Sequence, residues 1–159
     1  MSKEITKLRD ELLAGRSVIS FTSGTSMEPL LHDKTKKNAT HVLIVPMRGE
    51  CKVGDMPLVL MRDGKYVLHR LIKVEKKNGQ IFYRTRGDNC IGTEYVPQGA
   101  VLGVVSEIFY KNKTVKVTDK NYNRYVKFWM RTFPIRKLFM QCRVKAGRLY
   151  RICKNIISK

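Results

Sequence analysis

The chain has 159 residues, with 32 Lys or Arg against 13 Asp or Glu, and a formal net charge of +19. This length suits one domain with a short appendage and is enough to bury a hydrophobic core. The four cysteines are scattered, with no Cys-x-x-Cys pair and no histidine at zinc-ligand spacing, so we expect no metal site and no other cofactor. Thiols without an evident disulfide partner are typical of a cytoplasmic protein.

The first sixteen residues favour a short amphipathic helix. Ile5, Leu8, Leu12 and Leu13 recur at helical spacing, and Gly15 ends the pattern. Charged residues interrupt the same stretch, so it has neither the apolar core of a secretory signal nor a membrane anchor. We therefore expect a cytoplasmic protein.

Residues 18 to 118 favour short strands. Apolar and β-branched runs between turn residues predict strands at 18–21, 41–46, 56–61, 65–74, 80–86, 101–110 and 114–118. The Asn78-Gly79 pair between two of them is a strong hairpin signal. Many short strands with little helix predict a compact, mostly β domain over residues 1–118.

Polar side chains near the ends of these strands suit acyl transfer. Ser26, which follows Gly24 in a loop, supplies a hydroxyl that needs a base to become a nucleophile at neutral pH. His69 is a suitable base, because an unperturbed imidazole titrates at about pH 6.5. Asp88 or Glu94 would hold the imidazole in the right tautomer and stabilise the imidazolium.

The serine loop also suits an oxyanion hole. Gly24 permits a sharp turn that exposes Ser26, and the backbone N–H groups of Gly24, Thr25 and Ser26 would then face a developing oxyanion. Pro29 fixes the exit of the loop.

The order of these motifs resembles a known family. The motifs are Ser26-Met27-x-Pro29, Gly54-Asp55, His69-Arg70 and Gly87-Asp88-Asn89. This order is similar to the boxes of signal peptidases and of LexA-like self-cleaving repressors, over roughly residues 17–108. The resemblance implies a coiled β-sheet in which the serine loop and the histidine strand meet at one edge.

Two details place the resemblance more narrowly. His69 stands where bacterial signal peptidases and LexA-like proteins carry a lysine, so the base resembles that of the archaeal and endoplasmic-reticulum enzymes and implies a Ser-His mechanism. The Ser-Gly-Thr-Ser-Met loop is one residue longer than in signal peptidases and resembles the LexA loop, which implies an oxyanion hole of backbone N–H groups alone. In the His-type enzymes the acid lies six residues after the Asp of Gly-Asp-Asn, which here is Glu94. We favour Asp88 slightly and keep both.

Each of these residues also has an ordinary structural explanation. A serine beside Gly and Thr is common turn chemistry, His69 would suit a half-buried strand, and Gly87-Asp88-Asn89 is a usual hairpin turn. Their joint occurrence in family order favours a catalytic site. His32 lies in a polar stretch and His41 opens a strand, so neither is expected to take part.

Residues 119–159 differ in composition and form a basic helical tail. From Lys120 onward the chain holds 12 Lys or Arg and no acid, which leaves 19 − 12 = +7 for the rest. Pro134 separates two helical pieces. The second has one apolar stripe, formed by Ile135, Leu138, Phe139, Cys142, Ala146, Leu149, Cys153 and Ile156.

Three roles fit this tail. It would pack on the β domain, lie peripherally on an anionic membrane surface at the inner face, or bind nucleic acid. Nucleic acid is the least favoured of the three. No helix-turn-helix or zinc-finger pattern precedes the peptidase-like part, which weighs against a LexA-like repressor.

The sequence thus predicts a serine endopeptidase, cytoplasmic or peripherally membrane-bound, that acts through an acyl-enzyme on Ser26 with His69 as general base. Its expected substrate is a peptide or protein from which a leader is removed, since the family favours small, uncharged residues before the cut. The alternatives are a self-cleaving LexA-like regulator and a non-catalytic basic adaptor that binds lipid or nucleic acid.

Overall fold

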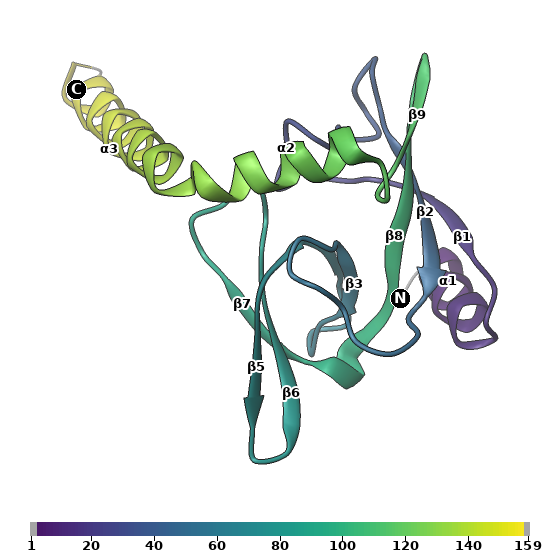
Figure 1. The fold of residues 1–159 in the computed structure, drawn as a ribbon. Helices are drawn as coiled ribbons and strands as arrows, with labels where there is room; N and C mark the ends of the chain where they lie inside the picture. Colours follow the sequence, from purple (N-terminus) through teal and green to yellow (C-terminus); the bar gives the residue numbers. More distant parts are fainter. Residues whose placement is uncertain (1–2, 158–159) are drawn as a thin grey trace.

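A computed structural model describes the backbone of residues 3–157 and the side chains of residues 7–146. The predicted fold class is confirmed, because a curled, mostly β body carries one short N-terminal helix and two C-terminal helices (Figure 1). Within the described residues, no helix is both long enough and apolar enough to cross a membrane.

The strands form two antiparallel sheets. The larger has the order β1-β2-β8-β3-β4 with β9 beside β8, and the smaller has the order β5-β6-β7. Their bounds are β1 Val18–Phe21, β2 His41–Pro46, β3 Pro57–Leu60, β4 Tyr66–Leu68, β5 Arg70–Lys77, β6 Gln80–Arg86, β7 Glu94–Pro97, β8 Val101–Tyr110 and β9 Lys113–Lys116. The pairing of β8 shifts register against both β2 and β3. Such irregularities bend strands and let the sheet curl.

Four of the predicted strands, 18–21, 41–46, 80–86 and 101–110, form with their predicted bounds. The single strand predicted over 65–74 is wrong. The chain leaves the larger sheet after Leu68 and enters the smaller one at Arg70, so His69 is the one residue between them. β7 escaped prediction because it is short and buries only Val96.

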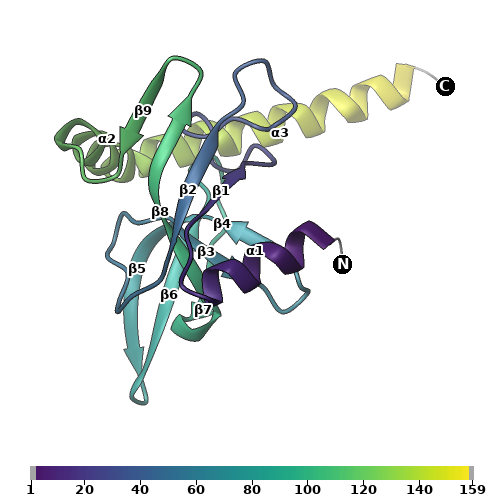
Figure 2. The same ribbon diagram turned by 90° about the vertical axis from the view of Figure 1, so that its right-hand side faces the viewer.

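The N-terminal helix α1 (Lys3–Leu13) forms as predicted and lies against the larger sheet (Figure 2). Leu12 enters the core, whereas Leu13 points to solvent. Gly15 has φ +80 and the N–H of Arg16 donates to the carbonyl of Glu11, which satisfies a terminal carbonyl of the helix. The side chain of Ile5 lies outside the described ones.

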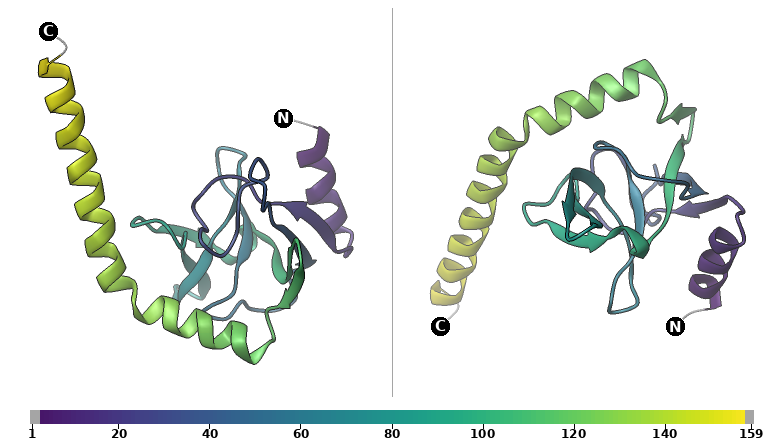
Figure 3. Two further views of the ribbon diagram at one scale, coloured as in Figure 1. Left: turned by 90° about the horizontal axis from the view of Figure 1, so that it is seen from above. Right: turned by 60° about the horizontal axis from the view of Figure 1, so that its bottom comes forward.

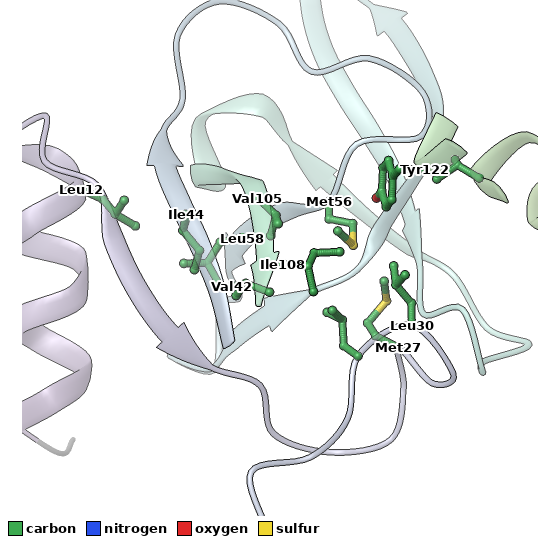
Figure 4. Packing of buried hydrophobic residues seen from close by; sticks show 12 residues of the cluster. Leu12, Met27, Leu30, Val42, Ile44, Met56, Leu58, Val105, Ile108 and Tyr122 are labelled. Carbon is green, nitrogen blue, oxygen red and sulfur yellow. The ribbon is translucent and has the colours of Figure 1, made fainter. Parts of the chain in front are cut away.

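One buried cluster joins parts of the chain that are distant in sequence (Figure 4). It takes Leu12 from α1, Met27 and Leu30 from the serine loop, strand residues such as Val42 and Ile108, and side chains of α2. Full burial of one such side chain stabilises the fold by about 1.5–3 kcal/mol. The part of the loop that directly follows Ser26 is therefore anchored in the core.

The β body and the first helix of the tail pack together across the predicted division at residues 118 and 119. Helix α2 (Lys120–Arg131) buries Tyr122 and Val126 in the same cluster as the sheet. Val126 lies so close to Gly54 that an added Cβ there would approach it to 3.2 Å. A cut after Thr118 would remove these side chains from the core.

The break predicted near Pro134 is confirmed, since α2 ends before Thr132 and α3 (Phe133–Ile157) has Pro134 as its second residue. The first backbone N–H groups of a helix have no carbonyl partner within it, so a proline at this position costs no hydrogen bond. Helix α3 extends away from the β body (Figure 3). The side chains predicted on its stripe at Leu149, Cys153 and Ile156 lie outside the described ones.

Candidate active site

The serine loop runs from the end of β1 to the start of β2, and Ser26 is half-buried in it. A buried threonine pair closes the base of this loop. The Thr22 hydroxyl donates to the carbonyl of His32 at 2.7 Å, and the N–H of Thr22 donates to the carbonyl of Thr40 at 3.3 Å. The N–H of His32 donates in turn to the Thr40 hydroxyl. His32 therefore helps to close the base of the loop through its backbone N–H and carbonyl groups.

His69 is buried and oriented by Glu94. Its Nδ1 lies 3.0 Å from Oε2 of Glu94, and the same oxygen accepts a hydrogen bond from the Thr85 hydroxyl at 3.1 Å. Thr85 pairs with Glu94 across β6 and β7, so strand register brings this carboxylate to the histidine. Because Nδ1 is engaged, Nε2 is the nitrogen left for proton transfer.

The other side of His69 faces the serine loop across Gly87. A Cβ built on Gly87 would lie 2.7 Å from the Ser26 carbonyl oxygen and 3.1 Å from His69 Nε2, so only glycine fits between them. The N–H of Asn89 donates to that Ser26 carbonyl at 2.7 Å, and the Asn89 amide donates to the Thr25 carbonyl at 3.2 Å. The Gly87-Asp88-Asn89 turn thus holds the serine loop beside the imidazole.

Among the described residues, the Ser26 hydroxyl has no hydrogen-bond partner. Catalytic hydrogen bonds are often long or poorly aligned until substrate is bound. The serine loop therefore lies beside His69 and Glu94, but the Ser26 hydroxyl makes no hydrogen bond to the imidazole.

The preference for Asp88 as the orienting acid is wrong, because both its carboxylate oxygens bind Arg70 while Nδ1 of His69 lies on Glu94. Nε of Arg70 donates to one Asp88 oxygen at 2.8 Å and Nη2 donates to the other at 2.6 Å. Arg70 is 1% exposed and Asp88 5%. Burial acts to lower the pKa of Arg70, but the hydrogen bond and charge of Asp88 outweigh it and raise that pKa above its usual value.

Arg70 also ties this ion pair to two other parts of the chain. Its Nη1 donates to the carbonyl of Gly54 at 2.9 Å and to the Tyr122 hydroxyl of α2 at 3.3 Å. The Gly54-Asp55 and Gly87-Asp88-Asn89 motifs therefore meet through Arg70 rather than through His69.

One predicted oxyanion donor is already occupied. The N–H of Gly24 donates to the carboxylate of Asp33, so Gly24 is not free to face an oxyanion. Hydrogen bonds from the Thr35 hydroxyl and N–H, and then from Gly24, lower the pKa of Asp33 to about 2. Within the described loop, the N–H groups of Thr25 and Ser26 make no backbone hydrogen bond and remain available. Gly24 has φ +85, which explains the glycine.

Sequence reasoning missed Arg136, which joins α3 to the site. Its Nη1 donates to the backbone carbonyl of Asp88 at 2.8 Å and its Nη2 to the carbonyl of Trp129 at 2.6 Å. The guanidinium also stacks 3.7 Å over the Trp129 ring, and Arg86 stacks 3.1 Å over Phe133. No local pattern marks Arg136, since it is one of many basic residues in the tail.

The described residues include no group of three or more His, Cys, Asp or Glu side chains arranged to hold a metal ion. No protein-family model and no curated protein matches this chain. The site has an imidazole with Nδ1 on the Glu94 carboxylate and Nε2 beside Gly87, and Gly87 in turn lies close to the backbone of the serine loop.

Proposed function

We propose that the protein is a serine endopeptidase whose catalytic residues are Ser26, His69 and Glu94. The observation that carries the proposal is the placement of His69, with Nδ1 3.0 Å from Glu94 and Nε2 beside Gly87 and the serine loop. A nucleophile, a base and a group that orients the base are the parts that acyl transfer needs.

The steps follow from these positions. Ser26 Oγ attacks the carbonyl carbon of the scissile bond while its proton passes to His69 Nε2, and the Glu94 carboxylate stabilises the imidazolium. The N–H groups of Ser26 and Thr25 would stabilise the oxyanion. The C–N bond then breaks and the leaving amine takes the proton from His69. Water attacks the ester carbonyl, again giving a proton to His69, which returns it to Ser26 as the acid product leaves.

The neighbouring strand supports a peptide substrate. β1 is an edge strand that pairs only with β2 among the described residues and runs directly into the serine loop. Ile19 and Phe21 alternate on its exposed side. An extended peptide that paired with this edge would carry its own backbone toward Ser26.

The experiment is digestion of a mixed peptide library, read by mass spectrometry, with the wild type and the Ser26→Ala variant. We expect cleavage by the wild type and a loss of several orders of magnitude in the variant. Acid quenching of the wild type should also trap a mass increase on the peptide that contains Ser26. Equal cleavage by both proteins would overturn the proposal.

The mass of the intact protein after incubation distinguishes a peptidase from the two alternatives, a self-cleaving regulator and a non-catalytic adaptor. A self-cleaving regulator would shorten itself at a rate independent of its concentration, with no cleavage of added peptides. A non-catalytic adaptor would show no acylation and no cleavage in either format.

A further inference from the structure

We propose that helix α3 docks on the surface of an anionic lipid bilayer, with its apolar face among the lipids and its Lys and Arg side chains on the head groups. This inference goes beyond peptidase activity and does not depend on it.

The first observation is an unpartnered apolar face. Ile135, Leu138 and Phe139 are 62%, 61% and 69% exposed, and their spacing of three and four residues places them on one side of the helix. Phe128 of α2 is also exposed, one helix earlier. Exposed aromatic and aliphatic side chains on one face of a helix mark an interaction surface.

The second observation is charge complementarity. Lys137, Arg143 and Lys145 are exposed on α3, and Lys127 and Arg131 are exposed on α2. The sequence from Lys120 onward has 12 basic residues and no acid to offset them. A helix with Lys and Arg on its polar face and Leu and Phe on the other suits the interface of an anionic membrane.

The same two observations disfavour other occupants. Nucleic-acid phosphates would neutralise the basic side chains but would leave Leu138 and Phe139 in water. A second copy of the chain would bury the apolar face but would bring two basic helices together without acidic partners. An anionic bilayer satisfies both faces at once.

The third observation is that the start of α3 is attached to the β body by side-chain contacts. Arg136 fixes the first turn of α3 to the carbonyl of Asp88, and Arg86 stacks on Phe133. Residue 88 belongs to the turn that holds the serine loop through Asn89. A bilayer bound along α3 would therefore keep the Ser26 loop at a defined position relative to the membrane surface.

The test is co-sedimentation of the whole chain with vesicles, either of phosphatidylcholine alone or of phosphatidylglycerol and phosphatidylcholine mixed. We expect binding to the anionic vesicles at least tenfold tighter than to the neutral ones. Binding should weaken as salt rises but should not vanish, because salt screens the charges and leaves apolar burial in place. Equal binding to both vesicles, or none to either, would overturn the proposal.

Two matched pairs of variants test the faces separately. Arg143→Gln with Lys145→Gln should weaken binding about 25-fold at low salt, as each basic residue near such a surface contributes about fivefold. The control, Lys77→Gln with Lys111→Gln, removes the same charge from exposed positions on the β body and should change binding little. Leu138→Gln should weaken binding about tenfold, whereas Leu13→Gln, at a similar exposure on α1, should not.

Further outcomes decide between occupants. Ser26→Ala should bind vesicles like the wild type, so a failure of the peptidase proposal would leave this result untouched. Equal losses from test and control charge variants would show non-specific attraction and would overturn the docking site. Tighter binding to a DNA duplex than to anionic vesicles would assign the tail to nucleic acid, and lipid-independent dimers lost in Leu138→Gln would assign it to a second copy.

Discussion

Two carboxylates six residues apart, Asp88 and Glu94, have opposite surroundings. Asp88 is almost wholly buried, and both its oxygens accept hydrogen bonds from the Arg70 guanidinium, which also donates to the Tyr122 hydroxyl of α2. Glu94 is partly open to solvent, and its Oε2 contacts both His69 Nδ1 and the Thr85 hydroxyl. The buried carboxylate holds elements together, whereas the more open one faces a group able to exchange protons. Burial and partner, rather than residue type, therefore separate the acid that pairs with Arg70 from the acid that we propose orients His69.

The largest expected effect is on catalysis at Glu94. Glu94→Gln keeps the size of the side chain but leaves no negative charge to orient His69 or to stabilise its imidazolium. We expect the rate of acylation to fall by about 10⁴-fold, as for an orienting acid in a catalytic triad. Steady-state cleavage of a peptide selected from the library measures this. A thermal melt should show almost no change, since the side chain is partly exposed.

Asp88→Asn should show the reverse. Removal of the charge leaves the buried Arg70 uncompensated, which typically costs about 3–5 kcal/mol of stability. Urea unfolding measures the loss, and the activity of the folded fraction should fall far less than in Glu94→Gln. If Asp88→Asn instead lost catalysis with an unchanged unfolding midpoint, the roles assigned to the two acids would be exchanged.

Gly87→Ala tests the close approach of the serine loop to the His69 imidazole. The new methyl group would meet the Ser26 carbonyl oxygen at 2.7 Å and the Cys90 sulfur at 2.8 Å, so the serine loop must move. A displacement of about 1 Å in a catalytic group costs about 10²-fold in rate. Gly92→Ala is the control, because a Cβ there meets nothing within 4 Å. Equal activity in both variants would show that the loop position is unimportant.

Tyr122→Phe sharpens the structural side of the comparison. It removes the hydroxyl that accepts from Arg70 at 3.3 Å while keeping the buried ring. The loss of one such hydrogen bond should cost about 1 kcal/mol in urea unfolding. A loss near zero would mean that Asp88 and Gly54 alone satisfy the guanidinium.

A third carboxylate, Asp33, gives the smallest effect and a pH dependence. Its pKa in the folded protein is about 2, below the value of about 3.9 for an unfolded aspartate. Its hydrogen bonds therefore stabilise the fold above about pH 4, and this contribution is lost as the pH falls to about 2. The difference in melting temperature between wild type and Asp33→Asn should shrink over that interval. A difference independent of pH would contradict the assigned hydrogen bonds.

Much of the fold was accessible from local patterns. Alternating apolar residues and turn signals predicted β1, β2, β6 and β8 with their bounds, and helical spacing predicted α1 and α3. Pro134 predicted the break between α2 and α3. The motifs around Ser26 and His69 likewise identified side chains that the fold brings to one place. These features were predictable because strand alternation, helical spacing and turn chemistry depend on neighbours a few residues away.

Tertiary structure alone decided the rest. Glu94 reaches His69 because β7 pairs with β6 in a register that places Glu94 opposite Thr85. Asp88 instead accepts a hydrogen bond from the buried Arg70 guanidinium. Helices α2 and α3 are both basic and lack acidic residues, yet α2 buries Tyr122 and Val126 while the described apolar face of α3 is exposed. Such outcomes depend on which surfaces are brought together by contacts distant in sequence, and an amphipathic pattern does not encode its own partner.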